Sequence, residues 1–465
     1  MTTPATLANL LAQMAQDQEV LNGWDAVVNL LESSVNSFFQ QQWNQRTGNS
    51  GQLSISAVWC DGVQTLHGIT FTNVYQFDVV LGPPLFQFQG GNNAVTVTQK
   101  IISGDLKTGT KTVNSGFNPQ NCGCKPNDPG VEWGQTQSIN TASNPTLSGT
   151  VALQQVQGLV ANSSSVILDF ASGAFVLNNM TVSGVANTTI VDQLKDWFAT
   201  NEIKYILASL NQQDFSSQPA LTPTSFQFHV ATTNAGNTIV QLLITTNGNQ
   251  PSSSTINVDE PIPTADGLTC SVMISSRIVF QSVLSAGFNR SSAPFQLIPM
   301  PPQNPSNSWY ATISPQMHFS GQFSFGSCCD RTTVTYSIYL GGNYTGSQNS
   351  GFLLSQHVTT QGNASVNITV SASYPVTLSG SGANQVIKIV PGTPSVSVSG
   401  SVEGEISSQL QSILNNDLRN SMAGVQFGPV TAFALENLIF PGNLMSMSQV
   451  QVPSDLLIVG TFSAT

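Results

Sequence analysis

The stretch Val334-Thr335-Tyr336-Ser337-Ile338-Tyr339-Leu340 sets apolar side chains at every second position. Successive side chains of a β-strand point to opposite faces, so this period predicts a strand with one buried and one solvated face. The same alternation recurs at residues 366–370 and 166–170. Such strands are typical of antiparallel sheets, and Gly, Asn and Ser supply the turns between them. The sequence therefore predicts an α+β, β-rich chain.

A few segments carry apolar residues at helical spacing instead. We expect helices at about residues 24–39, 191–210, 275–283 and 405–420, and a weaker one at 7–18. Ser275 is a suitable N-cap for the third helix. At the start of the first helix, the Asp25 carboxylate is expected to cap free backbone N–H groups. Long alternation with few helices predicts large curved sheets, each wrapped around a helix.

An approximate internal repeat divides the chain. In the first half a helix precedes the strand patterns 223–228 and 242–246, and in the second half a helix precedes 429–435 and 456–460. A polar, proline-containing stretch at 250–267 lies between the halves. A chain of 465 residues is also too long for one ordinary core. We predict two tandem modules, residues 1–253 and 254–465, that arose by duplication with insertions.

Charged residues are scarce, at 8% of the chain, and the net charge is −11 with only 12 Lys and Arg. Without a basic stripe, the phosphate backbone of a nucleic acid is repelled, so no nucleic-acid partner is expected. The same deficit argues against steering to an anionic membrane by charge. Any contact with lipid must therefore use apolar surface.

The sequence predicts at most peripheral membrane contact. No window approaches about 18 uninterrupted apolar residues, so no transmembrane helix is expected. Residues 1–20 lack the pattern of a signal peptide, so we expect cytoplasmic synthesis and, if the protein is released, a non-classical route. The apolar, proline-rich stretches 82–86 and 298–302 are expected to be exposed loops that suit a membrane-touching rim. For the aromatic run from Phe38 to Trp43, packing against a sheet is favoured over membrane insertion.

Catalytic signatures are missing. The sequence contains no nucleophile elbow, no phosphate-cradling glycine loop and no paired-histidine zinc motif. His67, His229, His318 and His357 lie in strand patterns, and His229 and His318 are expected on the polar face of a sheet. We therefore expect no enzyme activity, no catalytic residue, no cofactor and no metal.

The cysteines leave alternatives open. They are Cys60, Cys270, the Cys-x-Cys pair of Cys122 and Cys124, and the adjacent Cys328 and Cys329. Neither pair has the usual zinc spacing, and in a large chain the cysteines are sparse for a disulfide framework. Reduced thiols are favoured, and convergence of the two pairs in space would favour a metal site instead.

Several motifs together carry a resemblance to a known family. They are Gly23-Trp24-Asp25, Ala265-Asp266-Gly267 followed through Cys270 by Ile274-Ser275-Ser276-Arg277, and Val452-Pro453-Ser454-Asp455-Leu456-Leu457-Ile458, with 433–438 and 242–246 fitting as well. In order and spacing, over about residues 20–460, they resemble the accessory proteins encoded beside clostridial botulinum-type neurotoxins, in OrfX-type loci.

That family belongs to the tubular lipid-binding (TULIP) superfamily, whose modules wrap a curved antiparallel sheet around a long helix and leave an apolar groove. The resemblance implies lipid binding or transfer and an accessory role beside a toxin. The Gln- and Asn-rich, Lys-poor surface and the 122–129 loop depart from the family's pattern. This departure bears on the toxin association more than on the fold.

We therefore expect a non-enzymatic protein that binds or transfers a lipid, a fatty acyl chain or another apolar ligand. Its channel should be lined by the inward strand residues Phe226, Phe228, Val334, Tyr336 and Ile338. Two alternatives stay open. The inward residues could meet in a closed core, or the outer faces could bind a protein partner such as a toxin or another family member. Ligand identity and oligomeric state also stay open.

Overall fold

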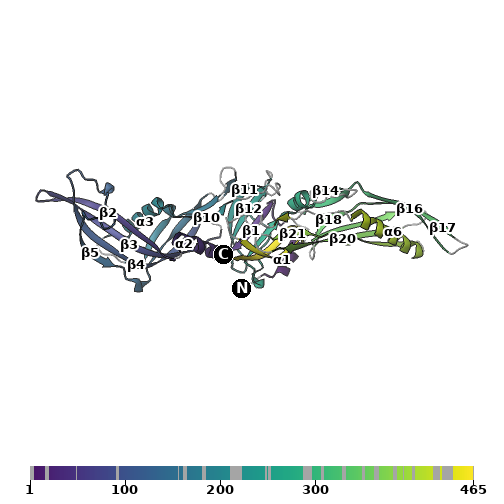
Figure 1. The fold of residues 1–465 in the computed structure, drawn as a ribbon, viewed down its shortest axis with the longest axis horizontal. Coiled ribbons are helices and arrows are strands. Elements are labelled where there is room, and N and C mark those ends of the chain that lie inside the picture. Colours follow the sequence, from purple (N-terminus) through teal and green to yellow (C-terminus); the bar gives the residue numbers. More distant parts are fainter. Residues whose placement is uncertain are drawn as a thin grey trace.

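The computed structural model describes residues 5–15, 20–48, 50–90, 94–154, 157–160, 165–180, 185–209, 222–246, 249, 253–285, 296–304, 308–326, 331–347, 351–360, 366–380, 385–390, 392–400, 404–422, 430–431 and 444–463. The molecule is elongated, and an N-terminal, a central and a C-terminal sheet follow one another along its long axis (Figure 1). The curved antiparallel sheets packed against helices confirm the β-rich fold class expected from the sequence.

The N-terminal sheet comprises β2 (Leu53–Leu66), β3 (Ile69–Phe88), β4 (Ala94–Thr112), β5 (Glu132–Ser138), β6 (Thr146–Gln154), β8 (Ser165–Asp169), β9 (Ala174–Asn178) and β10 (Lys204–Ser209). Its order is β10-β8-β6-β4-β3-β2, with β5 on β4 and β9 on β6. Two helices pack against it, α2 (Glu32–Arg46) on β3 and α3 (Asn187–Thr200) on β2 and β9.

The C-terminal sheet comprises β14 (Gln296–Met300), β15 (Tyr310–Ser314), β18 (Asn343–Ser347), β19 (Gly351–Thr360), β20 (Val366–Ser379), β21 (Val386–Ile389), β22 (Ser395–Gly400) and β23 (Val430–Thr431). Its order is β14-β15-β18-β19-β20-β21-β23, with β22 on β20. The strands β16 (Met317–Phe325) and β17 (Thr332–Leu340) form a hairpin at the end of the molecule, and α6 (Gly404–Met422) packs on β22 and β16 (Figure 1). The strand expected at 334–340 and the helix expected at 405–420 are thus confirmed.

The central sheet joins segments that are far apart in the chain. It comprises β1 (Ala26–Leu31), β7 (Gln157–Leu159), β11 (Pro223–Thr232), β12 (Thr238–Thr246), β13 (Cys270–Ile274), β24 (Leu444–Gln451) and β25 (Leu456–Ser463). Its order is β24-β25-β13-β1-β12-β11-β7. The hairpins β24–β25 and β11–β12 lie on either side of the pair β13–β1, with β25 next to β13 and β12 next to β1. The strand pattern 429–435, expected to correspond to 223–228, is not part of this sheet in its described residues: 430–431 form β23, which pairs with β21 in the C-terminal sheet, and β24 pairs with β25 instead. Residues 429 and 432–435 lie outside the described residues, and the internal repeat stays a prediction. The sheet takes strands from both sides of residue 253, and the division there stays a prediction.

Both faces of the central sheet are buried along its middle strands β25, β13, β1 and β12. One face contributes Val28, Leu242 and Ile458 to a continuous core that reaches into the N- and C-terminal sheets. The other face packs against α1 (Leu7–Met14) and residues of the 253–268 segment. Because neither face is solvated, β1 is apolar almost throughout and lacks alternation.

This burial explains why the first expected helix is wrong at its start. Residues 26–31 form β1, and the helix begins only at Glu32. The second expected helix is wrong at its end, because α3 stops at Thr200 and Glu202 takes a left-handed φ of 49°. The chain then enters β10 instead. The expected Ser275 cap is confirmed: its hydroxyl accepts from the Ile278 N–H at 3.4 Å, and α4 (Ser276–Ile278) continues into a π-helical turn, η7 (Val279–Leu284).

The two expected membrane-touching loops are strands. Residues 82–86 belong to β3, where the register with β4 shifts between Leu81 and Pro84, so the prolines sit at a bulge. Residues 298–300 belong to β14, an edge of the C-terminal sheet. The aromatic residues Phe38, Phe39 and Trp43 are buried on α2, as favoured from the sequence.

Candidate ligand site

A hollow of about 340 Å³ opens at the surface between β9 and α3. Its floor is apolar, because Phe175 and Leu177 on β9 and Val191 on α3 are buried. Val176, on the outer side of β9, is 55% exposed and also lines the hollow. Ligand pockets commonly enclose about 300–1,000 Å³, so this hollow has room for a small apolar group or the end of a hydrocarbon chain.

Polar side chains of α3 surround the mouth of the hollow, namely Asn187, Thr188, Asp192 and Lys195. Asn187 is held in place because its amide donates to the Met180 carbonyl at 3.1 Å. Asp192 and Lys195 are three positions apart, so they share one side of the helix. The rim therefore offers both a cation and a carboxylate to a polar group.

Below the floor lies a cluster of aromatic rings. The Phe175 ring centroid is 5.7 Å from that of Phe170 and 5.8 Å from that of Phe198. Phe170 is in turn 5.3 Å from Tyr205, and Tyr205 is 5.4 Å from Phe39 on α2. These ring contacts form continuous apolar packing from the hollow to α2.

Tyr205 is the polar exception in this cluster. Burial raises the pKa of its hydroxyl far above the usual value, and the Arg46 charge opposes that rise only in part. Among the described residues, none accepts from or donates to the hydroxyl. A buried hydroxyl without a partner costs about 1–3 kcal/mol. Sequence reasoning missed Tyr205 because it was assigned to a helix rather than to β10.

The five residues expected to line a channel lie in two separate places. Phe226 and Phe228 are buried on β11 in the central sheet, with the Phe228 ring 6.5 Å from that of Phe88. Val334, Tyr336 and Ile338 are on β17 at the far end of the C-terminal part, Ile338 buried and the other two half-buried (Figure 1). Partial burial and the Asp417 charge on α6 raise the pKa of Tyr336. Four of them, Phe226, Phe228, Tyr336 and Ile338, belong to or border the same core, and the role of all five as a lining stays a prediction.

Helix α6 closes the C-terminal sheet with both apolar and polar contacts. Leu410, Leu414 and Leu418 recur every fourth position and are buried. Asn415 accepts from the Val396 N–H at 2.8 Å and donates to the same residue's carbonyl at 3.5 Å. Because Val396 is on β22, the helix is tied directly to the backbone of that strand.

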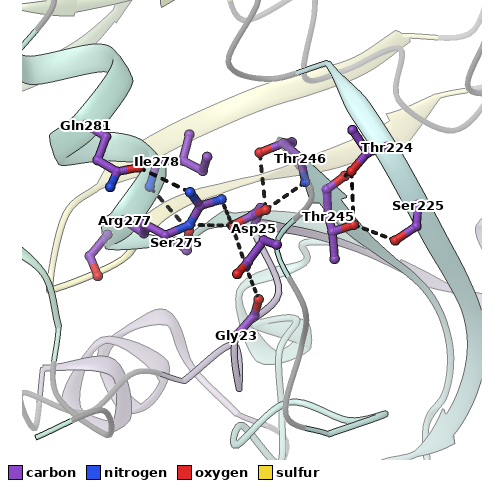
Figure 2. A network of polar contacts seen from close by, with 12 residues as sticks. Gly23, Asp25, Thr224, Ser225, Thr245, Thr246, Ser275, Arg277, Ile278 and Gln281 are labelled. Carbon is purple, nitrogen blue, oxygen red and sulfur yellow. Dashed lines mark hydrogen bonds and ion pairs between the residues drawn. The ribbon is translucent and has the colours of Figure 1, made fainter. Parts of the chain in front are cut away.

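A buried ion pair joins the two halves of the chain at one end of the central sheet (Figure 2). Asp25 accepts from Arg277 Nε at 3.0 Å and Nη2 at 2.5 Å, and from the Thr246 N–H at 2.7 Å. Asn249 donates a further bond at 3.1 Å. The expected helix cap is therefore wrong: Asp25 precedes a strand, and the buried carboxylate is satisfied by Arg277 instead. Asp266 and Gly267 lie in a turn, with a left-handed φ of 75° at Gly267.

Two of the described histidines, His229 and His318, contact an amide, a hydroxyl and a ring. His229 Nδ1 lies 2.9 Å from Gln241 Oε1, and Gln241 donates to Asn29 at 2.7 Å. His318 is exposed and stacks on Tyr339 at 4.4 Å. Both histidines lie on the polar side of their strands, as expected.

The expectation of reduced thiols is wrong for one pair of cysteines. Cys60 on β2 and Cys122 form a disulfide across 62 positions of sequence. The loop that contains η1 (Pro119–Asn121) folds back on β2, so topology rather than spacing brings them together. Burial raises the pKa of Cys124, while Lys111, with Nζ at 3.5 Å, opposes the rise. Cys328 and Cys329 lie outside the described residues.

Among helices of the described residues, none combines the length and the apolar character needed to cross a bilayer. No protein-family model and no curated protein sequence matches the chain.

The fold defines the class to which the chain is similar: elongated proteins with curved antiparallel sheets packed on long helices. P47 from Clostridium botulinum A2 has a TM-score of 0.53 at 14% identity, covering 96% of this chain and 99% of P47. P47 of Clostridium botulinum E1 has a TM-score of 0.52 at 11% identity, covering 95% and 100%. A lipopolysaccharide binding protein reaches a TM-score of 0.34 at 10% identity, covering 95% and 99%. The resemblance to clostridial toxin-cluster accessory proteins is thus confirmed at the level of the fold.

Proposed function

We propose that the chain binds an amphipathic molecule with a hydrocarbon chain, a fatty acid or a phospholipid, and does not convert it chemically. The observation that carries this proposal is the hollow between β9 and α3, whose apolar floor continues into the aromatic cluster. Each methylene removed from water contributes roughly 0.8 kcal/mol. Ten methylenes would contribute about 8 kcal/mol before the ordering cost of the ligand is subtracted.

One polar feature supports a ligand that also carries oxygen atoms. Lys195, which lines the hollow, can pair with a carboxylate or phosphate. An accessory role beside a bacterial toxin, implied by the sequence resemblance, is part of the same proposal.

The test is mass spectrometry of an organic extract of the purified protein, combined with titration of a fluorescent fatty acid. Val176→Asp puts a charge at the mouth of the hollow and should weaken uptake at least tenfold. Val390→Asp is the matched control, because Val390 is a similarly exposed valine outside the hollow. Protein that extracts clean and takes up no fatty acid refutes the proposal, as do equal affinities of the two valine variants.

One observation favours a second function, the binding of a partner protein. At the tip of the β2–β3 hairpin, Leu66 and Ile69 are paired across the turn and are 61% and 57% exposed. His67 and Gly68 form that turn with φ of 51° and 80°. Replacing Leu66 and Ile69 by serine should then abolish complex formation in gel filtration with a partner and leave fatty acid uptake unchanged.

A further inference from the structure

Three of the six cysteines meet at one place in the N-terminal part. Cys60 comes from β2, and Cys122 and Cys124 come from the loop that folds over it. Gly123 between them has a left-handed φ of 62°, which turns the chain at the site. As a result, the sulfur atoms of all three cysteines lie within 4.8 Å of one another. A structural disulfide needs two sulfurs, so it leaves the position of Cys124 unexplained.

The spacing of the sulfurs suits a tetrahedral metal ion. Zinc binds thiolates at about 2.3 Å, and the edge of such a tetrahedron is therefore about 3.8 Å. The Sγ atoms of Cys60 and Cys124 are 3.9 Å apart. Reduction of the Cys60–Cys122 bond lets those two sulfurs separate to non-bonded contact, which gives three thiols around a common point.

The neighbouring charges fit the same ligand. Lys111 Nζ lies 3.5 Å from Cys124 Sγ and 3.0 Å from Asp128 Oδ2. Three thiolates and Zn²⁺ carry a net charge of −1, which the ammonium group of Lys111 offsets. Asp128 is itself fixed by the Gly130 N–H at 2.8 Å and holds Lys111 beside the sulfurs, so the fourth ligand of a tetrahedral ion would be a water molecule.

Apolar residues pack on one side of the three cysteines, of which Cys60 is buried and Cys122 and Cys124 are partly exposed. Val74 and Val131 are buried with Cys60 in a small separate core, and Phe117 and Trp133 pack against it. Such packing limits the access of water on that side, which strengthens the attraction between thiolates and a cation. Sequence spacing gave no hint of this site, because Cys60 is 62 positions from Cys122.

We propose that Cys60, Cys122 and Cys124 form a redox-gated site for a thiophilic divalent cation, with Zn²⁺ as the ion tested. A dithiol or phosphine reductant supplies two electrons and the medium two protons, which convert the Cys60–Cys122 disulfide into two thiols. Zn²⁺ then displaces one proton from each of the three thiols. A disulfide oxidant such as oxidised glutathione then accepts two electrons from the Cys60 and Cys122 thiolates and is itself reduced to two thiols, while the bond between Cys60 and Cys122 forms again. This removes two ligands and releases the ion.

The experiment compares full-length protein before and after reduction with a phosphine, freed of metal and titrated with Zn²⁺ against a chromogenic chelator. Co²⁺ in place of Zn²⁺ reports thiolate ligation through charge-transfer absorption. The reduced protein should bind one ion at this site and the oxidised protein should bind at least a hundredfold more weakly. Lys111→Met removes a neighbour of the ligands and should lower the affinity for Zn²⁺ by ~10- to 100-fold. Cys124→Ser removes a ligand itself and should lower the affinity by more than that.

Two controls keep the outcome decisive. Cys124→Ser retains the disulfide, so its thermal unfolding in the oxidised state checks that the fold is intact. The double variant Cys328→Ser, Cys329→Ser tests the other cysteine pair and should bind Zn²⁺ as the parent protein does. The proposal is overturned if reduced protein binds no Zn²⁺, if folded Cys124→Ser binds it equally well, if the oxidised protein binds it equally well, or if binding depends on Cys328 and Cys329.

Discussion

Replacing Asp25 by alanine is expected to lower the free energy of unfolding by about 3–5 kcal/mol. The carboxylate is 1% exposed and pairs with Arg277, whose side chain is also largely buried. Its removal leaves the guanidinium without a counter-charge and the Thr246 N–H without its acceptor at 2.7 Å. The lost counter-charge dominates, because an unpaired amide alone costs about 1–3 kcal/mol.

Denaturant unfolding followed by tryptophan fluorescence measures this effect as a shift of the midpoint at constant slope. Asp25→Asn keeps an oxygen for the Thr246 N–H, so it should destabilise less than alanine does. The control is Lys204→Ala, which removes a more exposed ion pair with Asp169 at 3.9 Å and should cost less than about 1 kcal/mol.

A double-mutant cycle with Arg277→Met measures the interaction energy between Asp25 and Arg277 apart from their contacts with other residues. If the two charges depend on each other, the double variant should be more stable than the sum of the single effects predicts, by about 0.5–3 kcal/mol. An Asp25→Ala protein within about 0.5 kcal/mol of the parent, or strictly additive effects, would refute the reasoning.

Three further outcomes are expected. Cys60→Ser opens the loop of 62 positions closed by Cys122 and should cost about 4 kcal/mol under oxidising conditions and much less with a reductant, measured by denaturation in both states. Burial raises the pKa of Tyr374 from about 10 to about 12 despite an opposing hydrogen bond, so its stability contribution should be intact below pH 10 and be lost as pH rises from 10 towards 12. Ultraviolet titration of tyrosinate against Tyr374→Phe checks this, and ionisation near pH 10 would contradict it. Gly149→Ala sets a Cβ 2.7 Å from the Phe175 backbone on β9 and should lower thermal stability by about 1–3 kcal/mol, whereas Gly116→Ala meets open space and should be neutral.

Elements with one buried face could be predicted from the sequence. In β17 the alternating Tyr336 and Ile338 pack in or against the core, and in α6 the leucines recur every fourth position. The periodicity of apolar residues does not identify a strand when both of its faces are buried. Residues 26–31 are apolar on both sides of a central strand, and such a run fits a helix as well as a strand.

The features of the candidate sites depend on topology that no local pattern encodes. The hollow forms only because β9 pairs with β6 and α3 then returns across it. Tyr205 becomes a buried hydroxyl because the chain turns at Glu202 from α3 into β10. In the same way, Asp25 meets Arg277 across 252 positions, and a capping pattern beside an expected helix concealed that partner.

The strand order of the central sheet also bears on how the chain acquires its fold. Val28 on β1 faces Leu242 and Val272 on its two neighbours, and Val272 faces Ile458 beyond it. At a synthesis rate of about 5–20 residues per second, roughly 10–40 s pass between the synthesis of β1 and that of its first neighbour in the chain, β12. A similar time passes between the synthesis of β13 and that of β25. During that time the apolar strands have unpaired edges, which invite pairing with other chains. Most of the N-terminal sheet can form early, but the sheet that unites the molecule assembles last, so slow folding and a need for chaperones during expression are consequences of its order.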